Sequence, residues 1–416
     1  MKNYLVIQLA RFGDLVQTKR LIATLAARPD GVVHLCLDHS LAPLARLVHP
    51  EAVLHPVTAH ATGLDGKTAA LRMLVDNRRV FAELAATDFE TVYNLNFSGL
   101  NFRLAALFDP DRVEGYGWRD GQEITGRWPA MAMRWSGFRR LGMNLVDFWG
   151  AYCPDMLPPE RVNPEAAPKG GGIGVVLAGR ESRRSLPAPL LARIAATLAG
   201  ARKARSVKLL GGQAERAAGQ AVLKELPANL QSVTENLAGR TDWRGLAEVV
   251  GSLDLLVTPD TGTMHLAAHL GTPVAAFFLS SAWAFETGPY GLGHTVYQAA
   301  TDCLPCLETA SCRENVKCLN AFAAPGFQRF LVTGKAEHAP DGLLALHSVF
   351  DGLGQTYAPF AGTDPDADRR IVLRNFLLHH LHGAEPRFDR LEQDLARQLY
   401  LEKDWMTADK PSGAQG

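Results

Sequence analysis

Short apolar runs alternate with longer amphipathic segments along most of this chain. In the first half, apolar runs typical of buried parallel strands occupy residues 4–9, 32–37, 53–57 and 91–95. The helix-like segments between them include 15–28 and 67–86. The alternation resumes beyond residue 170, with strands expected at 174–177, 207–210, 255–257 and 274–278. Strands that alternate with helices in this way indicate an α/β fold built on parallel sheets.

A stretch rich in proline and glycine separates the two halves. Five prolines between Pro154 and Pro168 precede the run Gly170-Gly171-Gly172, a composition typical of a linker. We therefore expect two Rossmann-like, doubly wound domains, at 1–165 and 170–350. Ligands of such sheets bind beyond the carboxyl ends of the strands, so we expect the site in a cleft between the domains.

The composition changes again after about Gly354. Residues 369–382 and 388–401 each have the character of a helix, and an apolar stripe follows the second one at Phe388, Leu391, Leu395 and Leu399. We expect a helical extension over 355–416. Packing on the body or on a second subunit is favoured over binding to a membrane surface.

The totals exclude some classes of function. Lys plus Arg and Asp plus Glu both number 43, so overall charge gives no reason to expect a nucleic-acid partner. The chain start reaches Arg11 and Asp14 too early for a signal peptide. The longest apolar run, 271–285, is shorter than the ~20 residues of a membrane span. We therefore expect a cytoplasmic protein, in which the cysteines are thiols or metal ligands.

The most informative stretch is 254–273, which reads DLLVTPDTGTMHLAAHLGTP. It predicts a strand, a sharp turn over 260–263 and a helix over 264–270, with Asp260 and Thr261 as candidate caps. The free N–H groups of such a helix start attract phosphates, and Gly262 would let a ligand approach the backbone closely. His265 lies one turn into the helix, where it can donate a hydrogen bond. A strand, turn and capped helix without any ligand would explain the same residues.

This stretch resembles the signature of glycosyltransferase family 9, the bacterial heptosyltransferases. The family pattern D-[ST]-G-x-x-H-L-A-x-x-L-G-x-P is matched by Asp260, Thr261, Gly262, His265, Leu266, Ala267, Leu270, Gly271 and Pro273. The resemblance implies the GT-B architecture, two Rossmann-like domains that face each other across a cleft. It also implies that the helix start over Thr261, Gly262 and Thr263 holds the diphosphate of a nucleotide-sugar donor.

Further segments in the second half follow the same family in the same order. Gly211-Gly212-Gln213-Ala214-Glu215 resembles G-G-x-x-E, and 236–241 resembles N-L-x-G-[KR]-[ST]. The resemblance implies that both segments lie at the edge of the nucleotide pocket. Arg184 aligns with the phosphate-binding Lys of a K-R-W-P pattern, with Arg183 as its rival. Residues 287–291 match T-G-P-Y-G, whereas 279–283 depart from the family's G-P-T-D-P near the donor sugar.

Asp14 is the candidate catalytic base. It follows the glycine turn at Gly13 after the first strand, so it either caps a helix or accepts a proton from a sugar hydroxyl in the cleft. The family opens with R-x-x-x-x-G-D, and its Asp is the proposed general base. Here Gln8 occupies the position of the family's Arg, and Arg11 is the nearby candidate to supply that charge.

Four cysteines form the pattern C-x2-C-x5-C-x5-C at Cys303, Cys306, Cys312 and Cys318. Four thiols at short spacing either build a structural zinc site or remain plain thiols; no catalytic metal is expected. A second cluster, Trp128, Arg134, Trp135, Phe138, Arg139 and Arg140, is basic and aromatic. It either contacts an anionic glycolipid or membrane surface, or forms a half-buried helix with charged edges.

The resemblance implies an inverting, metal-independent glycosyltransferase whose donor is ADP-heptose or a related nucleotide-diphosphate sugar. The implied acceptor is a lipopolysaccharide core or another surface glycan at the cytoplasmic face of the inner membrane, which would bring peripheral contact with that membrane. Three alternatives stay open: a family 9 enzyme with another sugar and acceptor, an inactive sugar-nucleotide-binding scaffold, and a nucleotide-sugar epimerase.

Overall fold

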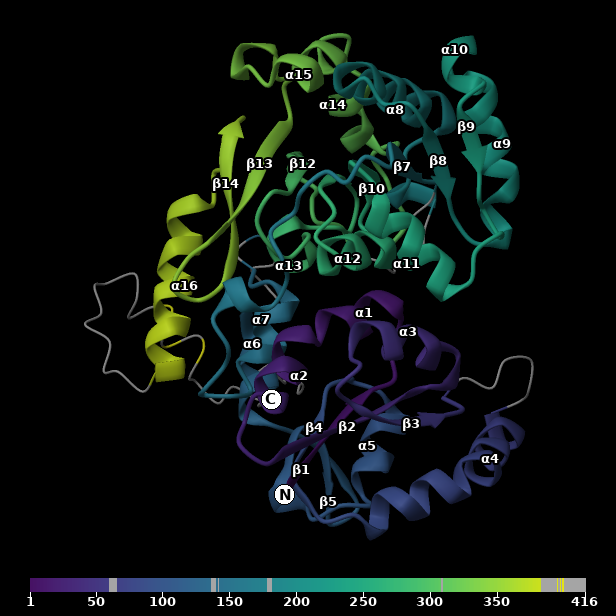
Figure 1. The fold of residues 1–416 in the computed structure, drawn as a ribbon. Helices are drawn as coiled ribbons and strands as arrows, with labels where there is room; N and C mark the ends of the chain where they lie inside the picture. Colours follow the sequence, from purple (N-terminus) through teal and green to yellow (C-terminus); the bar gives the residue numbers. More distant parts are fainter. Residues whose placement is uncertain are drawn as a thin grey trace, which may run out of the picture.

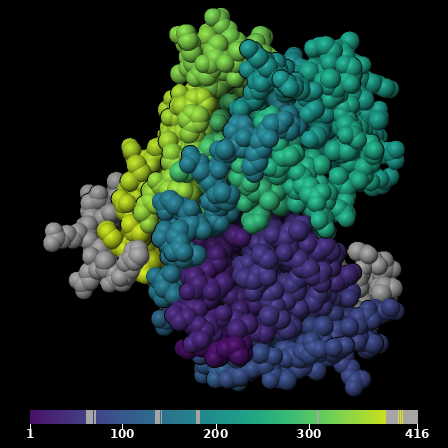
Figure 2. Space-filling view, in the orientation of Figure 1, coloured from purple at the N-terminus to yellow at the C-terminus, as the bar shows by residue number. Residues whose placement is uncertain are grey.

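The computed structural model describes residues 1–59, 66–135, 140, 142–177, 182–307, 310–382, 395, 397 and 399. These residues form two α/β lobes stacked one above the other, and the C-terminal segment runs along one side of both (Figures 1 and 2). Across those ranges, each helix is too short or too polar to cross a lipid bilayer.

The N-terminal domain contains one twisted sheet in the order β3-β2-β1-β4-β5-β6. The first five strands pair in parallel, and β6 pairs antiparallel to β5. The strands are β1 (Lys2–Gln8), β2 (Gly31–Asp38), β3 (Val53–Val57), β4 (Phe89–Asn94), β5 (Val113–Arg119) and β6 (Gln122–Thr125). The helices are α1 (Phe12–Gln17), α2 (Lys19–Ala26), α3 (Ala42–Val48), α4 (Gly66–Ala86), α5 (Gly99–Ala105), α6 (Arg127–Trp135) and α7 (Leu145–Gly150).

The C-terminal domain contains a second sheet in the order β14-β13-β12-β11-β10-β7-β8-β9. Its strands are β7 (Ile173–Val176), β8 (Val207–Leu210), β9 (Thr234–Asn236), β10 (Leu255–Pro259), β11 (Val274–Phe278), β12 (Thr295–Ala299), β13 (Leu343–Phe350) and β14 (Gln355–Ala361). Its helices are α8 (Ala188–Arg202), α9 (Arg216–Glu225), α10 (Ala228–Gln231), α11 (Trp243–Ser252), α12 (Gly262–His269), α13 (Ala284–Thr287), α14 (Asn320–Ala323), α15 (Phe327–Thr333) and α16 (Ala367–His382).

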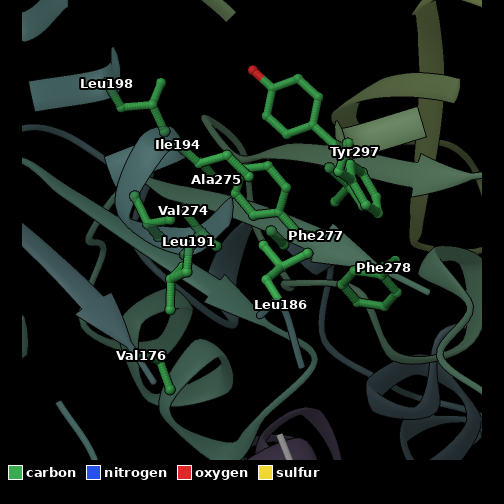
Figure 3. Close-up of a cluster of buried hydrophobic side chains, with 14 of the residues drawn as sticks. Val176, Leu186, Leu191, Ile194, Leu198, Val274, Ala275, Phe277, Phe278 and Tyr297 are labelled. Carbon is green, nitrogen blue, oxygen red and sulfur yellow. The ribbon is translucent and has the colours of Figure 1, made fainter. Parts of the chain in front are cut away.

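The core of the second sheet explains the apolar runs in the sequence. All five residues of β10 and all five of β11 are buried, because helices cover both faces of these central strands. Side chains of α8, such as Leu191 and Ile194, lie beside Phe277 of β11 and Tyr297 of β12 in this core (Figure 3). The expected α/β class and the GT-B pair of domains are confirmed.

The expected helical extension over 355–416 needs correction at its start. Residues 355–361 form β14, an edge strand that pairs antiparallel with β13 in the C-terminal sheet. The chain becomes a strand there because side chains of Gln355, Tyr357 and Ala361 are buried against that sheet. The predicted helix at 369–382 is confirmed as part of α16.

Helix α16 returns to the N-terminal domain, where it lies beside α6 and α7 (Figure 1). Its Leu373, Phe376 and Leu377 share one buried cluster with Trp128 and Trp149. The expected helix at 388–401 falls mostly outside the described residues. Its Leu395 and Leu399 are helical and pack on the same cluster. The described part of the tail therefore packs on the body of the protein.

The basic-aromatic stretch is held largely by internal contacts. Trp128 is buried and donates from Nε1 to the carbonyl of Phe148 at 3.0 Å. Arg134 donates to the carbonyl of Leu399 at 2.6 Å, and Arg140 to the carbonyl of Leu304 at 2.9 Å. Phe138 and Arg139 and the side chain of Trp135 lie outside the described part. The contacts favour a half-buried helix over a surface for lipid.

A buried ion pair of the N-terminal domain lies at its contact with the C-terminal domain. The guanidinium of Arg20 on α2 donates to the carboxylate of Asp147 on α7 at 2.6 Å, with side chains 3% and 0% exposed. The same carboxylate accepts hydrogen bonds from Tyr290 Oη and from the backbone N–H of Gln355, each at 2.6 Å. Both of the latter residues belong to the C-terminal domain, so one carboxylate ties three segments together.

Replacing Arg20 by Met should reveal how much this pair contributes. The substitution leaves Asp147 buried without its cation, and we expect the free energy of unfolding to fall by about 3–5 kcal/mol in urea denaturation. The matched control is Arg79→Met, which removes an ion pair with Glu83 on the exposed face of α4. That change should cost less than about 1 kcal/mol. Equal losses in the two variants would contradict the structural role assigned to Asp147.

Candidate active site

A cavity of about 970 Å³ lies between the two domains, at the carboxyl ends of β1, β7, β8 and β10. The N-terminal domain contributes residues of α1, and the C-terminal domain contributes the loops after its parallel strands. The predicted site residues that line it are Asp14, Arg184, Gly211, Glu215, Asp260, Thr261, Gly262, Thr263 and His265. The structure thus brings the candidate base and every predicted donor-binding residue to one cavity.

The start of α12 forms the floor of the cavity. Thr261 is the N-cap in extended conformation, and its side-chain oxygen accepts a hydrogen bond from the N–H of Met264 at 3.4 Å. The N–H groups of the first helical residues have no partner within the helix, so the partial positive charge of the helix start faces the cavity. This arrangement suits an anion.

The absence of a side chain at Gly262 also allows close packing between the two domains. A Cβ added there would lie 2.3 Å from Cδ1 of Phe12, so the missing side chain lets α1 of one domain approach α12 of the other. Gly13 has the reciprocal role, because its Cβ would lie 3.2 Å from Cδ2 of His265. The two glycines therefore set the distance between the candidate base and the helix start.

Asp260 is buried next to the start of α12 and forms an ion pair with Arg184. Its carboxylate accepts a short hydrogen bond from Nη2 of Arg184 and one from Oγ1 of Thr287 at 3.0 Å. The Nε of Arg184 is buried and, among the described residues, has no hydrogen-bond partner. Arg184 can therefore bind an anion at the helix start while Asp260 keeps its side chain in place.

His265 is 6% exposed and lies 3.9 Å from Asp260, measured from Nε2 to Oδ1. Burial lowers the pKa of His265 to about 4, although the charge of Asp14 acts in the opposite direction and Arg184 adds to the lowering. Near neutral pH the ring is uncharged, so it offers one N–H donor and one acceptor.

Asp14 lies in the third position of α1, and Arg11 rather than Asp14 is the N-cap residue. The Oδ2 of Asp14 accepts a hydrogen bond from the N–H of Arg11 at 3.1 Å, which fixes the carboxylate at the cavity wall. Arg11 itself lines the cavity. Gln8 is fully buried and its Oε1 accepts from the N–H of Ala10 at 3.2 Å. A positive charge thus reaches the cavity from Arg11, not from the position of Gln8.

The cavity extends along the loop after β8 to the start of α11. Glu215 bonds the N–H of Gly212 through Oε2 at 2.7 Å, so its carboxylate shapes the glycine turn. Trp243 spans the cleft at this end, donating from Nε1 to the carbonyl of Ser40 at 3.2 Å. The ring of Phe12 meets Trp243 edge-on, with centroids 4.8 Å apart.

Of the two arginines that compete for the phosphate position, only Arg184 lines the cavity. Arg183 donates instead to the backbone carbonyls of Leu307 and Ala310. Arg180 lies outside the described residues.

The sequence analysis assigned no role to several residues that line the cavity, namely Phe12, Gln17, Leu145, Trp243 and Glu286. Ser281 and Thr287 also line it, and they belong to the segments 279–283 and 287–291 that were compared with the family patterns. No local pattern distinguishes Gln17, because Asp14 on the same helix face is polar as well.

The four cysteines of the C-x2-C-x5-C-x5-C pattern are free thiols. Cys306 donates to the carbonyl of Cys303 at 3.5 Å, and Cys312 accepts from the N–H of Val316 at 3.3 Å. Burial raises the pKa of Cys318. In the described ranges there is no group of three or more His, Cys, Asp or Glu side chains arranged to hold a metal ion. The predicted zinc site is therefore not supported by this arrangement.

Comparisons with known proteins agree with this site. The family model described as glycosyltransferase family 9 (heptosyltransferase) matches residues 195–317. Lipooligosaccharide heptosyltransferase 2 of Haemophilus influenzae is 30% identical over 73 residues, which is 18% of this chain and 21% of that protein. The chain thus matches about a fifth of the length of this curated relative.

Three solved structures share the fold. E. coli ADP-heptose lipopolysaccharide heptosyltransferase II has a TM-score of 0.53 and 18% identity, covering 77% of this chain and 98% of that one. A family 9 glycosyltransferase from Veillonella parvula has a TM-score of 0.50 and 18% identity, covering 71% and 86%. E. coli heptosyltransferase WaaC, solved with ADP, has a TM-score of 0.50 and 16% identity, covering 71% and 93%. The family model confirms the resemblance of this chain to glycosyltransferase family 9, and these structures confirm its GT-B fold.

Proposed function

We propose that this protein is an inverting, metal-independent glycosyltransferase that uses a nucleotide-diphosphate sugar of the ADP-heptose class. One observation carries the proposal. The start of α12 and Arg184, whose buried Nε has no partner among the described residues, face the same cavity as the carboxylate of Asp14. An anion site opposite a fixed carboxylate is the arrangement that a displacement with a diphosphate leaving group requires.

The order of strands supports a direction for the donor in the cavity. The loop after β8, with Gly211 and Gly212, lies at one end of the lining. The elements that follow β7 and β10 supply Arg184 and the start of α12 in the middle, and the loop after β11 supplies Ser281 at the other end. We assign the nucleoside to the β8 end, the diphosphate to the middle and the sugar to the β11 end.

The chemistry follows from this placement. Asp14 takes the proton from the acceptor hydroxyl while the oxygen attacks the anomeric carbon, and the configuration inverts in a single step. The bond to the diphosphate breaks with oxocarbenium character in the sugar, so negative charge builds on the departing phosphate oxygens. The helix start and Arg184 stabilise that charge, and the neutral ring of His265 is placed to donate a further hydrogen bond.

The acceptor and the place of action complete the proposal. The relatives in Haemophilus influenzae and E. coli carry the names of lipooligosaccharide and lipopolysaccharide heptosyltransferases. We propose a lipopolysaccharide-core or similar glycan acceptor, bound on the side of the N-terminal domain, residues 1–165, with the donor on residues 170–350. Transfer would take place in the cytoplasm, with peripheral contact at the inner membrane.

Asp14→Asn tests the base. The amide keeps an oxygen for the N–H of Arg11 but cannot take a proton, so we expect the rate of transfer to fall at least about 100-fold. The affinity for ADP, measured by calorimetry, should stay within about twofold of wild type. Undiminished turnover would remove Asp14 as the base. A wild-type protein that binds ADP-heptose without transferring it to any glycan would favour the scaffold alternative.

Arg184→Met tests the diphosphate position. Loss of a charged donor from the anion site should weaken ADP binding about 10- to 100-fold. Arg183→Met is the matched control, because the Arg183 guanidinium bonds to the carbonyls of Leu307 and Ala310 and should leave ADP affinity unchanged. Arg184→Lys, which keeps the charge but loses the planar fork, should fall between them. Equal effects of both Met variants would argue against a specific phosphate contact.

A further inference from the structure

Gln17 is a buried polar residue in the cavity wall, and the proposed mechanism assigns it no role. It is the last residue of α1, it is 3% exposed, and it lines the cavity one helical turn beyond Asp14. Its Nε2 is buried and finds no hydrogen-bond partner among the residues that the structure describes. Most buried side-chain donors in proteins have a partner, so an unpaired amide in a ligand cavity points to a group on the ligand.

The position of Gln17 indicates which part of the ligand it meets. Helix α1 packs against α7, whose first residue, Leu145, also lines the cavity. The preceding Asn144 donates from Nδ2 to the carbonyl of Gly288 at 3.1 Å, next to Thr287. Gln17 therefore lies toward the β11 end of the cavity, away from the glycine turn after β8.

The charges at this end favour a neutral polyol over a further anion. The carboxylates of Asp14 and Glu286 lie in the lining, and Arg184, in the middle of the cavity, is already paired with Asp260. A second phosphate beside these carboxylates would be repelled, whereas a sugar hydroxyl can accept from an amide and donate to a carboxylate.

We propose that Gln17 is a specificity-determining residue which donates a hydrogen bond from Nε2 to a hydroxyl of the sugar being transferred. This inference rests on the proposed function, since it assigns the sugar end of the same donor cavity. A site built to bind a substrate hydroxyl discriminates against an analogue that lacks it, because the buried donor is then left unpaired. The N-terminal domain would thus contribute to recognition of the donor sugar through Gln17 and would also contribute the base.

The first experiment compares ADP and ADP-heptose binding to wild-type protein and to Gln17→Met by calorimetry. Met has nearly the shape of Gln but no donor. We expect the variant to bind ADP within about twofold of wild type and to bind ADP-heptose about tenfold more weakly. Equal affinity of both proteins for ADP-heptose would overturn the inference. Equal weakening of both ligands would also overturn it, because a merely structural role of Gln17 produces that result.

A second measurement varies the ligand instead of the protein and uses the same variant as its control. Monodeoxy analogues of ADP-heptose should bind wild-type protein almost as well as the parent, except for one analogue that loses about tenfold; Gln17→Met should no longer discriminate against that analogue. If no deoxy analogue is discriminated, the inference falls while the proposed donor stands. If wild-type protein binds neither ADP nor ADP-heptose, the result contradicts both the proposed donor and the role proposed for Gln17.

Discussion

The close approach of α1 to α12 is the contact on which the site depends. Each helix follows the carboxyl end of a central strand in its own domain, so both helix starts face the cleft. Phe12 rests against the backbone at Gly262, and His265 against the backbone at Gly13. A methyl group at either glycine would force Phe12 or His265 to shift, and Asp14 would move with α1. The absence of side chains at Gly13 and Gly262 therefore sets the distance between Asp14 and the start of α12.

The charges in the cavity are arranged around one buried carboxylate. Asp260 pairs with Arg184 and receives a hydrogen bond from Thr287. Burying a guanidinium without a carboxylate beside it would lower the stability of the protein. A guanidinium whose N–H groups were all bonded to carboxylates would have no donor available for a ligand. Within the described structure, the Nε of Arg184 has no hydrogen-bond partner. Burial lowers the pKa of His265 to about 4, so Arg184 carries the positive charge beside Asp260 near neutral pH.

Local patterns predict the strands and the start of α12, because both depend on residues that are near one another in the chain. The apolar run 255–257 and the turn at Asp260 predict β10 and α12 without any knowledge of the rest. Long-range contacts were not visible in the same way. No local pattern near 355–361 predicts that this segment forms the edge strand of the C-terminal sheet, and no local pattern around Gly262 predicts its contact with Phe12. Gln17 was missed for the same reason, since only the assembled cleft shows that its amide is buried in the cavity wall.

The two links between the domains differ in burial and charge. On the side of α16, Asp147 is fully buried and bonded to Arg20, Tyr290 and the backbone of Gln355. Near the loop after β8, Trp243 is joined to Ser40 by one solvent-exposed hydrogen bond and touches Phe12 edge-on. Breaking the buried hydrogen bonds from Tyr290 and Gln355 would leave the carboxylate of Asp147 without two of its donors, whereas an exposed hydrogen bond is readily replaced by water. The contact at Asp147 therefore stabilises the arrangement of the two domains more than the contact at Trp243 does.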